Sequence, residues 1–426
     1  MAAKMGTRGI YSADVEAKLP YRVFDVDNHI YQPEDADIRY LEKKYHDRVF
    51  PTGHKHRTQV DVVGDEHKAK TLGEHTVGIH AGVNPLEIPE MSGPIPVPGA
   101  MLNRLNPMKG LDRDEQERVV AHFRRMEPAF ENGKQRVQLM NEQGVEAAII
   151  HTPSRVYKVP FERNDMTAAY AATRAWNRYL DEEWRRGNED RIYVPAYIPL
   201  VDIDMALEEL DRCMKEGARV IGFDGGPAPG SRAPSDPYFD PFWERVNEAR
   251  LPLAIHSGTN FAHRGAEWGE DPNTPYKDFN GFQWCSFWQD LPTMETVFAL
   301  VFHGFLTRFP NINVIIAEHG TVWTPYVLRK MDHAHMLGRK PKWGGELPMR
   351  PSDMFKTRFA LAPFPEENVH RAIEMLGDDC LVFGSDFPHS EGLPDPVQYV
   401  VQLEGLSDGV VKKIMRDNLA RVLNAA

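Results

Sequence analysis

Cysteine is scarce in this sequence of 426 residues, where only Cys213, Cys285 and Cys380 occur. Thiols so far apart do not give the close spacing of a cysteine-rich zinc site, and three of them are too few for the disulfide framework of a small secreted domain. The N-terminal stretch also lacks the apolar core of a secretory signal. We therefore expect a protein of the reducing cytoplasm.

Long apolar runs and basic tracts are missing as well. No stretch approaches the ~18 consecutive apolar residues that a membrane-spanning helix requires, so we expect no membrane span. The 50 lysines and arginines are outnumbered by 62 aspartates and glutamates, and the formal net charge is −12. This balance argues against nucleic acid or an anionic membrane as the main partner, and a small-molecule substrate is the expected one.

Short apolar and β-branched segments alternate with amphipathic helical patterns, which is typical of repeated βα units around a parallel sheet. The expected strands are RVFDVDNH, VEAAIIHT, RIYVPAYIPL, ARVIGFDGG, LPLAIHSG, NINVIIAEHG, TRFALAPF and CLVFGSDFPH. The main helices are expected at 166–184, 204–216, 295–309, 365–376 and 407–423. Eight such units predict an α/β fold, a closed (β/α)8 TIM barrel.

One region breaks this alternation. Residues 35–133 are rich in proline, glycine and histidine and include stretches in which no parallel strand can run. We expect a long insertion after strand one that serves as a lid or an oligomer contact, with a merely structural embellishment as the alternative. The expected organisation is an N-terminal segment with strand one (1–34), the insertion (35–133) and the remainder of a single catalytic barrel (134–426).

The segment FDVDNHIYQP places ionisable side chains at alternate positions of the first strand, namely Asp25, Asp27 and His29. Alternate residues of a strand share a face, so all three are expected to point the same way. Because a buried charge without a partner is costly, something must compensate that face.

Residues of the same kind end other strands, at the face where TIM barrels place their catalytic groups. His256 ends strand five, His319 ends strand six and Asp386 ends strand eight. Singly, each has an ordinary alternative as a hydrogen-bonded structural histidine or a helix N-cap. In combination, imidazole nitrogens and carboxylate oxygens favour Zn²⁺, and they suit Mn²⁺ or Fe²⁺ as well.

These motifs resemble the amidohydrolase superfamily, in its branch related to aminocarboxymuconate semialdehyde decarboxylase. Asp-x-His after strand one, the histidines of IHSG and AEHG, and the segment FGSDFPH carry the resemblance. It implies a metal-dependent enzyme in which Asp27, His29, His256 and Asp386 are the metal ligands. Asp25 matches no ligand of the branch, and we expect it to support the ligands or to face a helix. The resemblance also implies that His319 transfers protons, and Asp386 is a second catalytic candidate.

Other positions define the expected ion and substrate contacts. Strand four ends in GFDGGPAPG, without a lysine to bridge two metals, so one divalent ion is expected, Zn²⁺ before Mn²⁺ or Fe²⁺. Lys330 stands where this branch commonly has an arginine that reaches a substrate carboxylate across a subunit interface, so Arg329 and Lys330 are candidate substrate contacts. Trp284, in the aromatic run GFQWCSFWQD, is a third, with helix packing as its alternative. Relatives in the branch are commonly homodimers or homotetramers.

The resemblance favours nonoxidative decarboxylation, a C–C lyase reaction, of an aromatic or dienoic carboxylic acid. The alternative is a metal-hydroxide hydrolase of an amide, lactone or ester. A distant alternative is a non-catalytic, metal-stabilised binding module, which would need a closed shell of four ligands. Glu318 and His389, as neighbours of predicted site residues, are expected only to orient them.

Overall fold

The computed structural model describes residues 19–33, 35–50, 128–152, 164–223, 225–227, 232–256, 268–271, 280–287, 290–365, 367–389, 392–393 and 395–425, with the strands β2 (Ile95–Pro96) and β3 (Phe123–Arg124). Most of the expected insertion lies outside these residues, so its role as a lid or an oligomer contact stays a prediction.

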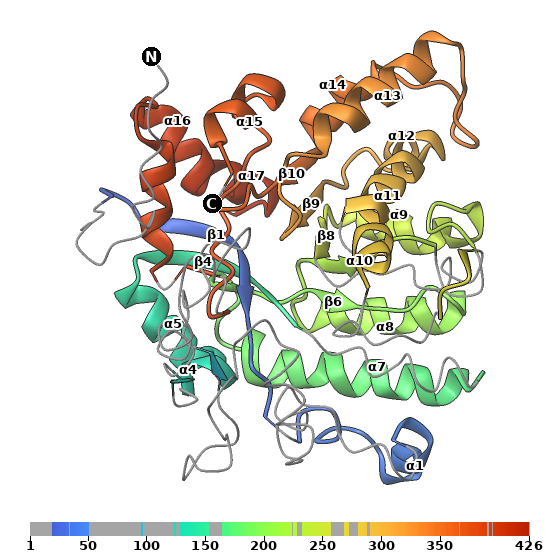
Figure 1. The fold of residues 1–426 in the computed structure, drawn as a ribbon. Coiled ribbons are helices and arrows are strands. Elements are labelled where there is room, and N and C mark those ends of the chain that lie inside the picture. Colours follow the sequence, from blue (N-terminus) through green and yellow to red (C-terminus); the bar gives the residue numbers. More distant parts are fainter. Residues whose placement is uncertain are drawn as a thin grey trace.

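The barrel strands run parallel in two hydrogen-bonded sheets, and the helices lie outside them (Figure 1). The strands are β1 (Val23–His29), β4 (Val145–His151), β5 (Ile192–Tyr193), β6 (Ala196–Tyr197), β7 (Ile221–Phe223), β8 (Leu253–His256), β9 (Val314–Ala317) and β10 (Phe359–Leu361). The third predicted strand comprises β5 and β6, which pair with β4 and β7 respectively. The eighth closes the ring, because Leu381 bridges to Leu361 and Phe387 bridges to Asn28. The predicted TIM barrel is confirmed.

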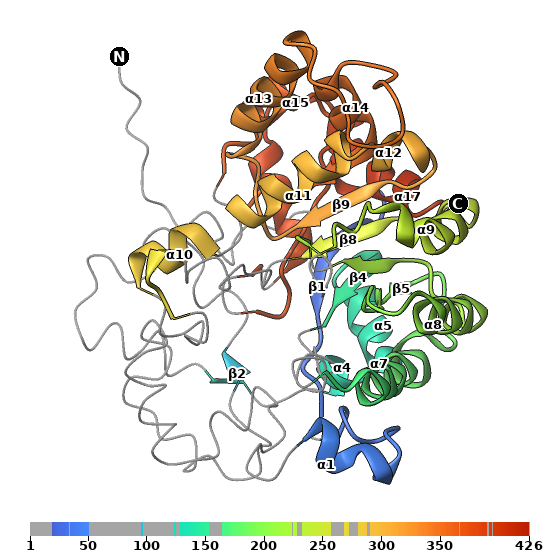
Figure 2. The ribbon, with the colours of Figure 1, turned by 90° about the vertical axis from the view of Figure 1, so that its right-hand side faces the viewer.

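Helices cover the outside of the strands (Figures 1 and 2). The longer ones are α5 (Gly133–Glu142), α7 (Met166–Leu180), α8 (Ile203–Lys215), α9 (Asp240–Glu248), α11 (Asp290–Phe302), α13 (Thr324–Met336), α14 (Pro351–Arg358) and α15 (Val369–Leu376). Shorter ones are α1 (His46–Val49), α4 (Pro128–Glu131), α10 (Gly281–Phe287), α12 (Phe305–Arg308), α16 (Asp408–Lys412) and α17 (Asn418–Val422). A π-helical turn, Asp181–Arg185, extends α7, and another, Lys413–Asp417, joins α16 to α17.

Successive residues of one strand pack on opposite sides, which explains why these strands are apolar throughout. Ile149 and Ile315 belong to a buried cluster formed mainly by the strands and α17. Their neighbours Ile150 and Ile316 belong to the larger cluster that joins the strands to the surrounding helices. Among the described helices, none combines the length and the apolar character needed to cross a bilayer.

The helix expected at 295–309 is two helices, α11 and α12, separated by Gly304. This glycine has φ of 73°, and a Cβ atom there would lie 2.0 Å from the backbone oxygen of Trp343. Only glycine tolerates both conditions without strain, so the break follows from a tertiary contact.

The first strand departs from regular alternation. Its register with β4 shifts between Asp25 and Asn28. Asn28 Nδ2 donates a hydrogen bond to Asp25 Oδ2 at 3.0 Å, whereas the side chains of Asp27 and His29 approach each other elsewhere, at 3.2 Å. The expectation that Asp25 shares a face with Asp27 and His29 is wrong, because the alternation rule holds only for a strand without an irregularity.

Candidate metal centre

Four side chains from three barrel strands meet where those strands end, and they are the predicted ligands Asp27, His29, His256 and Asp386. His29 Nε2 lies 3.2 Å from Asp27 Oδ1 and 3.0 Å from Asp386 Oδ1. His256 Nε2 lies 3.1 Å from the same Asp27 oxygen. Two imidazole nitrogens therefore converge on buried carboxylates, the arrangement that a shared cation would stabilise.

Glu318 joins this group, although only an orienting role was expected for it. Its Oε2 lies 3.2 Å from His256 Nε2. One ligand atom each from Asp27, His29, His256 and Glu318 lie within 4.8 Å of one another. Glu318 and Asp386 both have φ of 57°, a left-handed conformation that is uncommon outside glycine and frequent at functional sites. Position beside a strand-end histidine was the only sequence signal for Glu318.

The buried charges at this centre shift one another's pKa values. Burial acts to raise the pKa of Asp27, but hydrogen bonds and charge from His256 and His29 outweigh it and hold that pKa well below the usual value. Burial acts to lower the pKa of His29, but the carboxylates of Asp27 and Asp386 outweigh it and raise that pKa. Positive charge is therefore favoured between these carboxylates.

His319 follows Glu318 and is fully buried. Its Nδ1 lies 2.7 Å from the backbone oxygen of Ala317, so Nδ1 carries the proton and donates it. Nε2 then has a free lone pair, and it has no hydrogen-bond partner among the described residues. Burial lowers the pKa of His319 to about 4, which keeps the ring neutral at pH 7. The side chain is thus a neutral proton acceptor.

Two more histidine rings support the predicted ligands. His389 stacks on His29 with ring centroids 3.9 Å apart, and its Nδ1 lies 2.9 Å from Asp386 Oδ1. His151 stacks on His256 at 4.1 Å, and its Nε2 lies 3.1 Å from the backbone oxygen of Val26. Burial lowers the pKa of His151 well below the usual value. Sequence reasoning overlooked His151, whose only signal is its place at the end of the second strand.

The predicted substrate contacts lie apart from this cluster within the described chain. Arg329 and Lys330 are exposed on α13 and line a cavity of about 880 Å³ that includes none of the predicted ligands. Trp284 lies on α10 and is 48% exposed. Figure 2 shows α10 on the side of the barrel toward which β8 and β9 point, opposite the helices α8 and α9.

A small cavity opens beside the predicted ligands. It is lined by Asp27, Glu318, Ala362, Pro363, Phe364, Pro365, Gly384 and Asp386. Its volume is about 10 Å³, which is too small for an aromatic molecule, and it brings the acidic groups next to proline and phenylalanine side chains.

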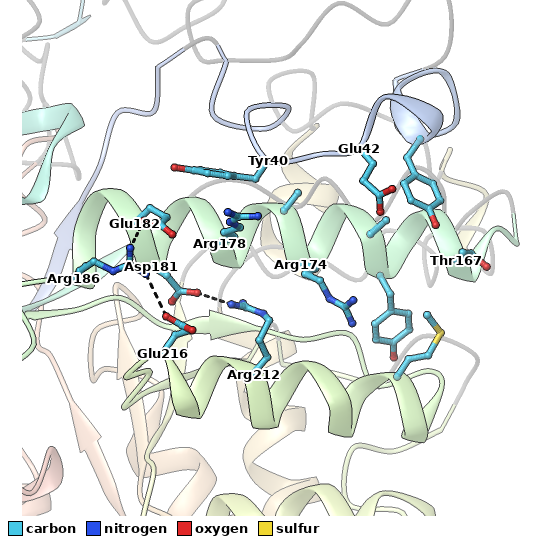
Figure 3. A pocket seen from close by; sticks show the side chains of 15 residues that line it. Tyr40, Glu42, Thr167, Arg174, Arg178, Asp181, Glu182, Arg186, Arg212 and Glu216 are labelled. Carbon is cyan, nitrogen blue, oxygen red and sulfur yellow. Dashed lines mark hydrogen bonds and ion pairs between the residues drawn. The ribbon is translucent and has the colours of Figure 1, made fainter.

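Another cavity, of about 480 Å³, lies on the outer surface along α7 and α8 (Figure 3). It is lined by both acidic and basic side chains, and several of these already pair with each other. Arg212 lies 2.8 Å from Asp181, and Arg186 bonds to Glu182 and Glu216. None of the predicted ligands lines it, and the pair between Arg212 and Asp181 joins α8 to the turn that extends α7.

Comparison with known proteins adds independent information. The sequence model of the amidohydrolase family matches residues 102–425. Among curated relatives, gamma-resorcylate decarboxylase of Polaromonas sp. strain JS666 is 26% identical over 275 residues, which are 59% of this chain and 76% of that protein.

Solved structures resemble the chain as well. An amidohydrolase from Mycobacterium avium subsp. paratuberculosis K-10 has a TM-score of 0.74 and 26% identity, with 95% of this chain and 100% of that one covered. A dihydroxybenzoic acid decarboxylase from Polaromonas sp. strain JS666, with bound manganese and the inhibitor 2-nitroresorcinol, has a TM-score of 0.53 and 19% identity, with 75% and 92% covered. The latter likeness is one of fold.

Proposed function

The chain belongs to the amidohydrolase family and is an enzyme, and on this premise we propose that it decarboxylates an aromatic carboxylic acid with the help of one divalent metal ion. The convergence of His29 and His256 on Asp27 is the observation that carries the proposal, together with His319 Nε2, which has no hydrogen-bond partner among the described residues. A cation holder and a neutral proton acceptor at one barrel mouth are the two parts that this chemistry needs.

The proposed ligands are Asp27, His29, His256 and Asp386, and Glu318 is close enough to be an additional one. These donors are nitrogen and oxygen only, a set that fits Zn²⁺, Mn²⁺ or Fe²⁺. The sequence places Zn²⁺ first, and the manganese in the Polaromonas decarboxylase supports Mn²⁺. When bound, such an ion supplies positive charge that holds a substrate carboxylate and an adjacent oxygen.

Decarboxylation leaves an electron pair on the ring carbon, which must receive a proton in place of the departing CO₂. We assign this transfer to His319, whose Nε2 is free to take a proton from an acidic group of the substrate and return it to that carbon. Asp386 is the second candidate. The prolines and Phe364 beside the proposed ligands would limit the access of water to them.

The proposal includes a homodimer or homotetramer. Tyr326, Met336 and Leu337 leave 54%, 77% and 61% of their surface exposed on or next to α13, which is unusual for a helix of a solitary chain. Arg329 and Lys330 belong to the same helix. Burial of this face against a second copy would let them contribute to the partner's site. The free thiols Cys213, Cys285 and Cys380 support a reducing compartment, the cytoplasm.

The test begins with metal analysis of the purified protein. It continues with a screen of hydroxybenzoates against simple esters and lactones. We expect about one divalent ion per chain, CO₂ release from a hydroxybenzoate, loss of activity with a chelator and recovery when the ion is returned.

Single substitutions connect the ion to the named ligands. His29→Ala and His256→Ala should lose both metal and activity, whereas His370→Ala, at an exposed position of α15, should lose neither. Two ions per chain, full activity without any ion, or ester hydrolysis without CO₂ release would each contradict the proposal.

A further inference from the structure

Arg136 lies on α5, and none of its surface is exposed. Its guanidinium donates hydrogen bonds in three directions. Nη1 bonds to the side-chain oxygen of Asn28, and Nη2 bonds to the backbone oxygen of His29 at 2.8 Å. Nε bonds to the backbone oxygen of Ala129 at 2.7 Å. Two of the three acceptors therefore belong to the strand that carries the proposed ligands.

Aromatic rings enclose this guanidinium. The rings of Phe130, Trp184 and Phe387 lie with their centroids 5.8, 5.6 and 5.5 Å from its central carbon. Contact with these rings offsets part of the cost of burying the cation. A buried charge contributes little net stability. The buried guanidinium of Arg136 is therefore better explained by the fixed geometry of its hydrogen bonds than by a gain in stability.

The hydrogen bonds continue from Asn28 to the last barrel strand. Asn28 Nδ2 donates to Asp25 Oδ2 at 3.0 Å. The other oxygen of Asp25 accepts from the backbone N–H groups of Asp27 at 3.1 Å and Ser385 at 2.9 Å. The hydroxyl of Ser385 also donates to Asp25 Oδ2, at 2.5 Å. Asp25, whose side chain faces away from the cavity, thus joins the first strand to the eighth.

This network contacts the first and the eighth strand, in each case directly next to a proposed ligand. Ser385 immediately precedes Asp386, whose backbone N–H donates to the backbone oxygen of Asp27 at 2.8 Å. On the first strand, Arg136 holds the carbonyl of His29 itself. A shift of the guanidinium would therefore move His29 and Asp27 relative to Asp386.

We propose that Arg136 is a positioning residue that sets the relative placement of His29, Asp27 and Asp386 through the Asn28, Asp25 and Ser385 hydrogen bonds. The inference rests on the proposed function, because these residues are its proposed metal ligands. Lysine has the same charge without the planar fork of donors, so it could not reach all three acceptors at once.

Arg136→Lys in the full chain is the test. Its affinity for Mn²⁺ is measured by competition with a chelating dye, and the visible absorption of the Co²⁺-loaded protein reports the geometry of the ligands. We expect binding weaker by about 10–100-fold, as for other residues that orient metal ligands, together with a changed Co²⁺ spectrum. The far-UV circular dichroism should match that of the wild type.

Arg185→Lys is the matched control. Arg185 is also a buried arginine, its guanidinium lies 2.6 Å from Asp181, and among the described residues it makes no hydrogen bond to any of the three ligand-bearing strands. Its replacement should lower the melting temperature without changing Mn²⁺ affinity. If Arg136→Lys fails to fold, Ser385→Ala keeps the arginine and removes the hydroxyl bond to Asp25, and it should also weaken Mn²⁺ binding.

Wild-type Mn²⁺ affinity and an unchanged Co²⁺ spectrum in a folded Arg136→Lys protein, or in Ser385→Ala where the first does not fold, would overturn this inference. A wild-type protein that binds the ion but releases no CO₂ from any hydroxybenzoate would overturn the proposed function alone. A wild-type protein that binds no divalent ion would overturn both.

Discussion

At the scale of single residues, the proposed chemistry depends on the protonation state of His319. Its Nδ1 proton is committed to the backbone oxygen of Ala317, which leaves Nε2 as the reacting atom. Replacement by asparagine preserves a polar group and removes the titratable nitrogen. We predict that His319→Asn lowers turnover by ~100-fold or more, with the fold and the bound metal retained, as steady-state kinetics and metal analysis would measure.

His303→Asn provides the control for this substitution, because His303 is partly buried and hydrogen-bonded to Ser235 Oγ at 2.9 Å, outside the candidate site. Its turnover should equal that of the wild type. Loss of metal from His319→Asn would identify His319 as a ligand. Retention of most activity would move the proton transfer to another group, first Asp386.

Which residues meet at the barrel mouth could be predicted largely from strand order. Parallel strands of a barrel end on one face, so polar residues at strand ends such as His256 and Asp386 were expected together. Glu318 was not expected among them, because it reaches the cluster through a left-handed backbone conformation that the residue type does not predict. Asp25 was rightly left out of the ligands, but the face of its side chain was predicted wrongly because the register shift that turns it away comes from pairing with β4.

At the scale of elements, buried apolar runs identified the strands, since few other arrangements accommodate continuous β-branched segments. The ends of the helices were harder to predict from the sequence. The pattern at 295–309 continues through Gly304, and only the approach of Trp343 explains why the chain breaks there. Helix caps are easier to recognise in the sequence, because they depend on local residues, as with Asp165 directly before α7.

Asp165 joins two elements. Its Oδ1 accepts from the backbone N–H of Ala168 at 3.1 Å and caps α7, and its two oxygens bind Arg48 of α1 at 2.6 and 2.7 Å. We predict that Asp165→Ala lowers the free energy of unfolding by about 1–2 kcal/mol, chiefly through loss of the cap, as measured by urea denaturation.

Two further substitutions separate the cap from the ion pair. Asp165→Asn keeps a capping oxygen and weakens the pair, so its loss of stability should be smaller. Arg48→Ala removes the pair and keeps the cap, and its loss of stability should be the smallest of the three because Arg48 is 43% exposed. Equal losses in all three variants would assign the stability to the ion pair.

At the scale of the whole molecule, the strand count predicted a barrel, and the pairing of the eighth strand with both Leu361 and Asn28 closes it. The region between the first two strands has no comparable rule, because its many prolines and glycines do not follow the pattern of a strand or a helix. Its two ends do come together. The backbone N–H of Tyr31 donates to the oxygen of Phe130 at 3.0 Å, and the two rings pack with Phe387.

Because the chain leaves and re-enters the barrel at adjacent points, the middle of this region can be shortened at little entropic cost to closure. We predict that excision of residues 71–105 leaves the helix content and the metal content unchanged, as circular dichroism and metal analysis would measure. Either KM should rise or the oligomeric mass should fall, because the segment leaves the barrel directly after Asp27 and His29. A shortened protein with wild-type kinetics and wild-type mass would contradict the prediction, and the pocket would then be built by the other βα loops alone.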